Sequence, residues 1–379
     1  MAFARSDSSL IARWWWTIDR WSLTAVSLLV FFGLLLSMAG SPAVAVRLDR
    51  PEFFFVYRQM FYVSIAIAVM FLTSLLTPRG VRRLGVMLFV GAWVAMVLTL
   101  LVGRELNGAT RWLFIGSISF QPSEFMKPGF VIICAWMIAE ARKGVGIPGE
   151  IVAFLILGLV LSVLVLQPDY GQASLVTAVW LLLLFTGGVA LIWPLGLFVT
   201  AMIGSGIAYM TVPHVTSRVD RFLDPASGDT YQAETAMSAV MNGGLLGRGP
   251  GEGVLKRVLP DAHTDFIFAV AAEEYGLIAC AVILGVFFFI VMRSFFRIVN
   301  EQDHFTQLAA SGLIALFGMQ ALINMAVNLG LLPAKGMTLP FISYGGSSSV
   351  AVGLTIGMLL ALTRRRSGSQ ASNRRRTAA

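Results

Sequence analysis

The chain has 379 residues, of which 57% are hydrophobic and only 13% are charged, and its mean hydropathy is +0.79. Soluble domains carry about 25% charged residues, so this composition excludes a soluble globular enzyme and indicates a polytopic membrane protein. The net charge is +8, but the basic residues stand in short groups between apolar runs, which argues against a nucleic-acid partner. Cys134 and Cys280 both fall inside apolar runs, so neither a disulfide nor a zinc site is expected.

Ten segments are apolar enough to cross a membrane, since a spanning helix needs about 20 such residues. The run 170–217 contains no Asp, Glu, Lys or Arg and is too long for one span, so we divide it at Gly187-Gly188 and Trp193-Pro194. The spans are 21–46, 59–78, 84–103, 122–139, 151–168, the two halves of 170–217, 275–292, 305–329 and 350–363. The last is short and is expected to begin near Gly345. The predicted fold class is an all-α membrane bundle of ten helices.

The distribution of Lys and Arg predicts the orientation of this bundle. Ten spans place both termini on one side, and basic clusters mark the cytoplasmic ends of membrane helices. These clusters comprise Arg5, Arg13, Arg20, Arg79, Arg82, Arg83, Arg142, Lys143, Arg293, Arg297, Arg364 to Arg366 and Arg374 to Arg376. The one long loop, about 212–264 between spans seven and eight, is therefore extracytoplasmic. Residues 1–366 form a single membrane domain, and 367–379 form a disordered basic cytoplasmic tail.

Two parts of the long loop have a recognisable pattern. The periodicity of residues 231–241 predicts a helix that ends at Asn242-Gly243-Gly244. Alternating glycines follow from Gly247 to Gly253, and their backbone N–H groups could cradle a phosphate. No strand precedes them, so a flexible loop is the favoured interpretation.

The most unusual stretch is 259–276, where His263, Asp265, Glu273 and Glu274 stand at the entrance to an apolar run. A carboxylate inside a membrane is costly unless it is paired or used. Thr264 or Asp265 can cap the helix that begins here, but capping explains only one acidic residue. Glu273 follows Asp265 by eight residues, so it lies on roughly the same helix face and about 12 Å deeper. We therefore predict an active site at this entrance.

Other polar residues gather in the remaining outer connections. Glu124 and Lys127 are three apart at the start of span four and can pair. Two interpretations stay open: an exposed ion pair after a helix start at Pro122, or Arg111 and Lys127 presenting cations to an anionic headgroup. The turn 167–172 has ordinary turn chemistry. The connection 328–349 is apolar but interrupted by Pro and Gly, which predicts a re-entrant loop lining a cavity, with Lys335 as its only charge.

Three segments together resemble the SEDS glycosyltransferases of bacterial cell-wall synthesis. They are Asn107-Gly-Ala-Thr-Arg-Trp112 with Gln121-Pro-Ser-Glu124, then His263-Thr-Asp-Phe-Ile-Phe-Ala-Val270 with Glu273-Glu274, and Gly330-Leu-Leu-Pro-Ala-Lys-Gly-Met-Thr-Leu-Pro-Phe-Ile-Ser-Tyr-Gly-Gly-Ser-Ser348. Within the family the chain resembles the division branch, which is FtsW-like, more than the elongation branch, which is RodA-like. The reasons are the absence of a longer insertion at Arg221-Phe-Leu-Asp-Pro225 and the segment Gly249-Pro-Gly-Glu-Gly253.

This resemblance implies a reaction and its partners. Such proteins polymerise lipid II, a disaccharide peptide on undecaprenyl pyrophosphate, at the outer face of the bacterial cytoplasmic membrane, and division members act at the septum. Asp265 falls on the family's essential aspartate, and we expect it to be the general base. The implied partners are a class B penicillin-binding protein transpeptidase and other divisome membrane proteins.

The residues themselves suggest how such a site would work. Pyrophosphate needs cations, and the candidates are Arg111, Lys127, Arg218, Arg221 and Lys335, with Mg²⁺ or Mn²⁺ as the only cofactor considered. The expected supporting residues are Glu124, His263, Glu273, Glu274, Ser343 and Ser347.

Two other functions fit part of the pattern. A lipid II flippase would use the acidic residues Glu273 and Glu274 and the broken last loop equally well, and it is the alternative. An assembly scaffold without chemistry would make a neutral substitution at Asp265 silent.

Overall fold

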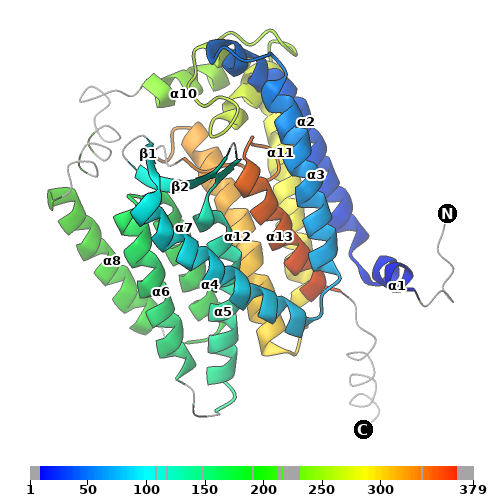
Figure 1. Cartoon of the computed structure of the whole chain (residues 1–379). Coiled ribbons are helices and arrows are strands. Elements are labelled where there is room, and N and C mark those ends of the chain that lie inside the picture. The colour runs from blue at the N-terminus through cyan, green and yellow to red at the C-terminus, as the bar shows by residue number, and fades with distance from the viewer. Residues whose placement is uncertain are drawn as a thin grey trace.

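The computed structural model describes residues 9–364, except for 107–108, 117, 145, 147, 190–191, 212–215, 217–219, 221–230 and 334–335. The chain is a bundle of long helices with one end covered by short elements (Figure 1). Each predicted span corresponds to a helix: α2 (Arg20–Arg47), α3 (Phe54–Ser74), α4 (Pro78–Val102), α5 (Pro122–Ala141), α6 (Gly149–Leu166), α7 (Tyr170–Thr186), α8 (Ile192–Thr211), α11 (Ile267–Ile298), α12 (His304–Asn328) and α13 (Gly346–Leu362).

The lengths of these helices agree with a bundle of ten spans. Six of them, α2, α3, α4, α6, α11 and α12, are long and apolar enough to cross a membrane by themselves. The helices α7 and α13 are apolar but shorter, and α5 carries charges at both ends. The break between α7 and α8 occurs at Gly187-Gly188, as predicted, whereas Trp193-Pro194 lies in the first turn of α8. The pair of thiols at Cys134 and Cys280 is buried and free.

A small antiparallel sheet departs from the all-helical expectation. It has the order β1-β2-β3, with strands at Arg104–Leu106, Ala109–Ile115 and Ile118–Phe120. Trp112 pairs with Arg104 on one side, and Leu113 pairs with Phe120 on the other. The stretch between spans three and four is too short to cross the membrane and holds β-favouring residues, so hairpins satisfy its backbone. The predicted fold class therefore gains a sheet without losing a span.

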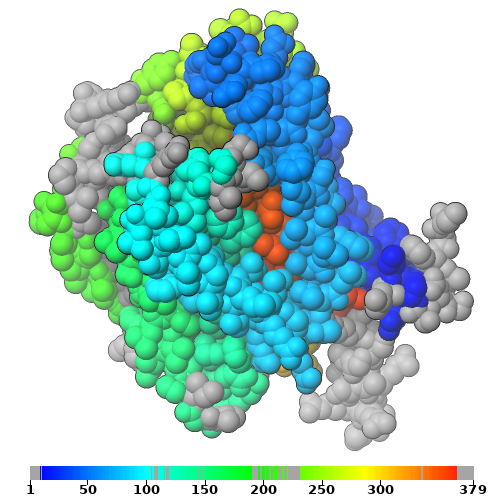
Figure 2. All heavy atoms as spheres, viewed as in Figure 1, coloured from blue at the N-terminus to red at the C-terminus, as the bar shows by residue number. Residues whose placement is uncertain are grey.

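The last helix occupies the centre of the bundle. Every residue of α13 from Ser347 to Leu362, apart from Val350, is buried, and Figure 2 shows α13 only in a narrow strip between its neighbours. Its glycines permit this packing: a Cβ on Gly357 would lie 1.8 Å from Thr73 Oγ1, and one on Gly353 would lie 2.5 Å from Ala66 O. Close approach of α13 to α3 thus depends on small residues, as in other membrane helix pairs.

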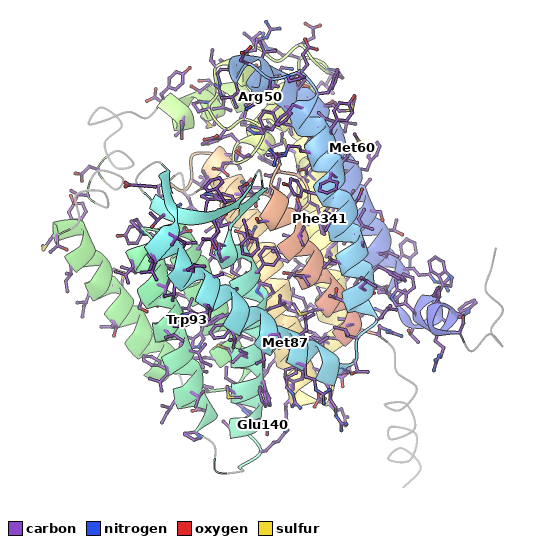
Figure 3. All side chains as sticks on the ribbon, viewed as in Figure 1. Arg50, Met60, Met87, Trp93, Glu140 and Phe341 are labelled. Carbon is purple, nitrogen blue, oxygen red and sulfur yellow. The ribbon has the colours of Figure 1, made fainter. Side chains whose placement is uncertain are left out.

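The start of α2 and the ends of α11 and α13 meet at one end of the bundle. Asp19, just before α2, lies 2.9 Å from Arg293 Nε and 3.0 Å from Arg297 Nε near the end of α11. Arg364, which follows α13, donates to Thr17 Oγ1 at 3.0 Å and to Ser74 O at 3.2 Å. Figure 3 places Glu140 at this lower end, Arg50 at the opposite end and Phe341 inside the bundle.

Short elements cover the upper end. The helix α10 (Tyr231–Gly243) and the 3₁₀ turn η2 (Leu255–Arg257) belong to the long loop, and α10 confirms the helix predicted there. Both elements contact α11, and the sheet lies at the same end of the bundle (Figure 1). This is the end of the molecule that holds the predicted active-site stretch.

Candidate active site

The start of α11 is fixed by two asparagines of α12. Asn324 Nδ2 and Asn328 Nδ2 each donate to Asp265 O at 2.9 Å, and Asn328 Oδ1 accepts from Ala269 N at 3.0 Å. The N-cap residue of α11 is Phe266, and no side chain caps it. The suggestion that Thr264 or Asp265 caps this helix is therefore wrong, and the Asp265 carboxylate is not used for that purpose.

Asp265 instead faces a cavity of about 460 Å³. No hydrogen bond or ion pair joins its carboxylate to another side chain in the described part of the chain. A Cβ on Gly336, which has φ +61°, would lie 3.6 Å from Asp265 Oδ2. The segment after Gly336 lines the cavity as predicted for a re-entrant loop, and the other walls include Tyr62, Arg111, Trp112, Ser119, Gln121, Gln232, Asp261, Thr264, Asn324, Thr338, Tyr344 and Ser347.

The environment of Asp265 makes it a better base than an ordinary carboxylate. The pKa of Asp265 is raised from 3.8 to about 7, mainly by burial and next by the charge of Asp261, while the cation of Arg111 opposes the rise. Asp261 is exposed beside the cavity and adopts a φ of 51°. Sequence reasoning missed Asp261, although it stands only four residues before Asp265.

Arg111 is held at the cavity by the turn between α6 and α7. Its Nε donates to Gln167 O at 3.3 Å and lies 3.7 Å from Asp169 Oδ2, and its Nη2 donates to Pro168 O. Asp169 also caps α7 by accepting from Gln172 N. The turn that sequence analysis treated as ordinary therefore orients the one predicted pyrophosphate-binding cation that the described residues place in this cavity.

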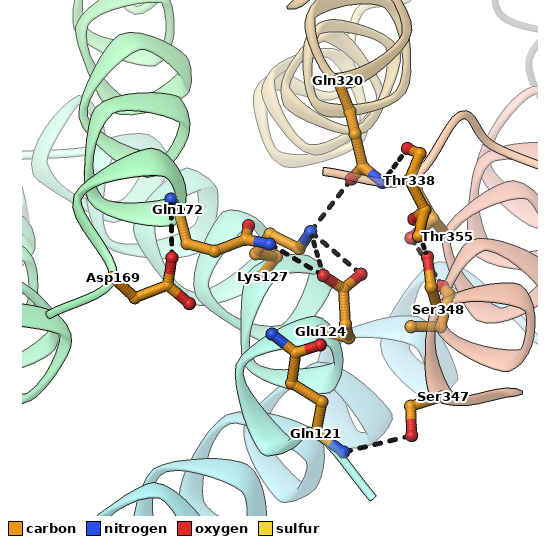
Figure 4. A network of polar contacts seen from close by, with 11 residues as sticks. Gln121, Glu124, Lys127, Asp169, Gln172, Gln320, Thr338, Ser347, Ser348 and Thr355 are labelled. Carbon is orange, nitrogen blue, oxygen red and sulfur yellow. Dashed lines mark hydrogen bonds and ion pairs between the residues drawn. The ribbon is translucent and has the colours of Figure 1, made fainter. Parts of the chain in front are cut away.

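The buried pair of Glu124 and Lys127 lies deeper in the bundle (Figure 4). Lys127 Nζ is 3.0 Å from both oxygens of Glu124 and donates to Gln320 Oε1 at 2.9 Å, while Gln172 Nε2 donates to Glu124 at 2.8 Å. Each earlier interpretation holds only in part: α5 begins at Pro122 and the ion pair forms, but the pair is buried, and Arg111 lines the Asp265 cavity whereas Lys127 does not. Gln320 donates to Thr338 O at 3.1 Å, so the pair supports the cavity wall indirectly.

The two predicted serines have different positions. Ser347 lines the cavity, accepts from Gln121 N at 3.1 Å and donates to Ser119 O at 3.3 Å, which joins α13 to the sheet. Ser343 is buried and accepts from Leu339 N at 2.7 Å within the re-entrant loop. Ser343 therefore stabilises the loop and does not face the cavity.

His263 packs inside an aromatic cluster. Its ring lies 4.6 Å from the Phe55 ring and 5.2 Å from the Tyr344 ring, measured between centroids. Burial, together with the charge of Arg47, lowers the pKa of His263 from 6.5 to about 4. The imidazole is thus neutral near pH 7, and its place is beside the cavity wall rather than in the cavity.

Glu273 and Glu274 hold the outer loop and do not reach Asp265. Glu273 accepts from the backbone N–H groups of Val254 and Leu255 at 2.9 Å each and of Lys256 at 3.3 Å. Glu274 forms a buried ion pair with Lys256. Both carboxylates are fully enclosed and satisfy groups of the loop, so their role is structural.

The glycine-rich segment completes this attachment. The helix α11 is broken at Gly276, whose φ is 78° and ψ 178°. Arg248 N and Gly249 N donate to Glu273 O and Glu274 O at 2.9 and 3.0 Å, and Leu277 N donates to Gly244 O at 3.0 Å. The N–H groups of Arg248 and Gly249 are therefore occupied by the protein and are not free to bind a phosphate.

Three predicted cations, Arg218, Arg221 and Lys335, lie outside the described residues. Several cavity residues were not singled out by sequence analysis, namely Tyr62, Gln232, Asp261, Asn324, Thr338 and Tyr344. Apart from Asp261, their signal is weak, because they are isolated polar or aromatic residues on separate segments.

The family comparison agrees with this arrangement. The family model FTSW_RODA_SPOVE, described as "Cell cycle protein", matches residues 20–368. The chain belongs to this family. It is the family that includes the SEDS glycosyltransferases, as the three segments suggested.

Individual relatives of this family match over nearly the whole chain. A Caulobacter vibrioides protein named "Probable peptidoglycan glycosyltransferase FtsW" is 48% identical over 97% of this chain and 95% of its own. A Hydrogenovibrio crunogenus protein of the same name is 35% identical over 91% of each chain.

Solved structures of the family share the fold. A chain of a complex described as "Structural coordination of polymerization and crosslinking by a peptidoglycan synthase complex" is 27% identical, with a TM-score of 0.76 over 91% of this chain and 97% of that one. The rod shape determining protein RodA of Thermus thermophilus is 27% identical, with a TM-score of 0.69 over 92% of this chain and 97% of that one. The chain is thus a multi-pass membrane protein that is FtsW-like by sequence.

Proposed function

We propose that this protein polymerises lipid II into glycan strands with Asp265 as the general base. Its FtsW relatives are named as peptidoglycan glycosyltransferases, and the chain is an enzyme of that class. The observation that supports the role of Asp265 is its position: the carboxylate faces a cavity and is joined to no other described side chain, while Glu124, Glu273 and Glu274 are paired inside the protein.

The chemistry needs one proton acceptor and one anion-binding group. The 4-hydroxyl of the acceptor sugar attacks the anomeric carbon of the lipid-linked strand, and its proton passes to Asp265. As the new C–O bond forms, the bond to pyrophosphate breaks, and undecaprenyl pyrophosphate leaves with the electron pair. A general base contributes typically about 10²–10⁴-fold to such a step. Pyrophosphate is already a stable anion, so a second carboxylate acting as an acid is not required.

Arg111 is the described cation that supports departure of the pyrophosphate. It lines the same cavity as Asp265, and three acceptors of the turn between α6 and α7 hold its guanidinium in place. A cation fixed before the reaction stabilises developing charge without reorganisation. We propose that Arg218, Arg221 and Lys335 contribute further positive charge.

We propose that a divalent cation, Mg²⁺ or Mn²⁺, accompanies the pyrophosphate. Among the described residues, no three His, Cys, Asp or Glu side chains come close enough to hold an ion by themselves. We propose that phosphate oxygens and water supply most of the ligands of this ion, as is common for Mg²⁺. Such an ion would supply charge neutralisation to the leaving group.

The distribution of charge supports an active site on the outer side of the cytoplasmic membrane. Arg293, Arg297 and Arg364 gather at the end opposite Asp265, and basic residues favour the cytoplasmic side. We propose on this basis that both termini are cytoplasmic and that the protein works at the division septum.

The partners are proposed from the same relationship. One similar structure belongs to a peptidoglycan synthase complex described as coordinating polymerization and crosslinking. We propose that a class B penicillin-binding protein transpeptidase binds this chain and that other divisome membrane proteins join the assembly.

The decisive experiment is polymerisation of labelled lipid II by the purified protein, with and without the transpeptidase, followed by gel separation of glycan chains. Asp265→Asn should reduce chain formation by at least about 10²-fold. Asp49→Asn is the matched control, because Asp49 is exposed and does not line the Asp265 cavity. Normal chain formation by Asp265→Asn would remove Asp265 from this role.

A transport assay distinguishes the flippase alternative from the polymerase. A flippase moves fluorescent lipid II between the leaflets of vesicles without making polymer. Movement by both wild type and Asp265→Asn, with no polymer from either, would favour transport over synthesis.

A further inference from the structure

A second and larger cavity lies beside Glu274 and Tyr275, at the end of the α11 half-helix, which comprises residues 267–275 before the break at Gly276. Its volume is about 820 Å³, and it shares no lining residue with the Asp265 cavity. Its walls come from α2, from the loop that contains η2, and from Glu274 and Tyr275 of α11. Figure 1 shows the upper part of α2 beside α11, and the two helices are in contact. The larger cavity is called the groove from here on.

One wall of the groove is an apolar stripe of α2. The stripe repeats at helical spacing and consists of Leu35, Met38, Ala39, Pro42, Ala43 and Val46. Small residues in its middle leave room beside the helix. Twelve residues separate Leu35 from Arg47, which corresponds to about 18 Å along a helix. One leaflet of a bilayer has a hydrocarbon depth of about 15 Å, so the groove extends from the headgroup level towards the membrane midplane.

The outer rim of the groove is basic. Arg47, Lys256 and Arg257 lie there, opposed by the single carboxylate of Glu274. Lys256 is neutralised by its buried ion pair with Glu274 and also donates to Gly251 O at 3.2 Å. Arg47 and Arg257 are exposed, and neither forms an ion pair with any residue in the described part of the chain. Two cations thus face the water above an apolar wall.

We propose that this groove binds a lipid with a phosphate headgroup. Its acyl or isoprenoid chain would lie along α2, and its phosphate would contact Arg47 and Arg257. The apolar wall and the two arginines together favour this class of ligand. A free anion would leave the apolar wall of about 18 Å without a contact, and an apolar partner helix would leave the two arginines without a counter-charge. The volume is within the range of about 300–1,000 Å³ that ligand cavities usually have. Polyprenyl pyrophosphates and anionic phospholipids both have this chemistry.

The proposal is independent of the catalytic role of Asp265. The groove contacts the C-terminal end of the half-helix, whereas Asp265 precedes its first residue. Substitution of Asp265 should therefore leave lipid binding in the groove unchanged, so failure of one proposal does not remove the other.

Native mass spectrometry of the full chain in phosphatidylcholine nanodiscs tests the proposal. The ligands are a polyprenyl pyrophosphate, phosphatidylglycerol and inorganic pyrophosphate. We expect one or both lipids to bind at this site, and inorganic pyrophosphate at least about tenfold more weakly. Arg47→Gln with Arg257→Gln should weaken that binding about tenfold or more, since each cation near a phosphate contributes about one kcal/mol. Binding of polyprenyl pyrophosphate alone identifies a carrier lipid, and binding of phosphatidylglycerol alone identifies a membrane phospholipid.

Matched variants distinguish loss of lipid binding in the groove from general effects of a substitution on the protein. Ala43→Trp fills the groove without changing its charge and should abolish the same binding event. Leu28→Trp and Arg50→Gln change exposed residues that lie outside the groove and should leave it intact. Wild-type lipid affinity in both the arginine variant and Ala43→Trp would overturn the proposal, as would inorganic pyrophosphate binding as tightly as the lipids.

Discussion

Asp265 stands just before the α11 half-helix and Glu273 lies near its end, but one carboxylate faces a cavity and the other is enclosed by protein. The carboxylate of Glu273 accepts three backbone N–H groups of the outer loop and is completely enclosed. The carboxylate of Asp265 faces a cavity of about 460 Å³, and only its backbone carbonyl is held, by two asparagines. Glu273 thus attaches the half-helix to the outer loop, whereas the carboxylate of Asp265 is left accessible in the cavity. The presence of an acidic residue in a membrane protein therefore does not by itself indicate a reactive group. Its hydrogen-bond and ion-pair partners must also be known.

The largest expected effect comes from removing each carboxylate in turn. Glu273→Ala should destabilise the protein by about 3–5 kcal/mol, because it leaves buried N–H groups of Val254, Leu255 and Lys256 without an acceptor. Asp265→Ala should abolish polymerisation without destabilising the protein, and at neutral pH it should stabilise it, because the ionised carboxylate is unfavourable in the folded state. Unfolding curves of both variants in one detergent measure this. Equal destabilisation would contradict the division of roles.

A smaller effect should follow from disturbing the break in α11 at Gly276, which comes shortly after Glu273. Gly276→Ala should cost about 1–3 kcal/mol, because an alanine is strained at φ 78° and its Cβ would lie 2.3 Å from Leu245 O. Gly285→Ala in the same helix is the control, since its Cβ would meet nothing within 4 Å. That control should stabilise the protein slightly through helix propensity. Thermal unfolding of the two variants distinguishes them, and equal shifts would show that the break is unimportant.

The smallest expected effect is a shift in the pH dependence of polymerisation. Asp265 must be deprotonated to act, and its pKa is raised to about 7, so activity should rise with pH and level off above that value. Asp261 raises this pKa and Arg111 lowers it. Asp261→Asn should therefore move the acid limb to lower pH, and Arg111→Gln should move it to higher pH. Shifts in the same direction, or none, would argue against Asp265 as the titrating base.

Linkage gives the same carboxylate an effect on stability. Because its folded-state pKa lies above the unfolded value, the native protein binds this proton more tightly between pH 4 and 7. The contribution of Asp265 to stability is therefore present at low pH and is lost as pH rises through about 7. The ionised form of Asp265, which the reaction needs, is therefore the form in which the folded protein is less stable.

The sequence was informative where one physical cause dominated. Charge-free runs of about 20 residues located the spans, and the glycine- and proline-rich connection after α12 indicated a loop lining a cavity. The pairing of Glu124 with Lys127 was predicted from their spacing and is confirmed. Their burial and their further partners Gln172 and Gln320 were not predictable, nor were the partners of Glu273 and Glu274, because these partners are 17 to 193 residues away and come from other elements. The sheet was missed because its strands are only three to seven residues long.

The central position of α13 has a consequence for biosynthesis. This helix follows the nine other spans in the chain, yet it fills the middle of the bundle and places Gly346, Ser347 and Ser348 in the wall around Asp265. The nine earlier spans must therefore leave a slot that closes only after α13 has been made. A product terminated before α13 would lack both this innermost helix and part of the cavity wall.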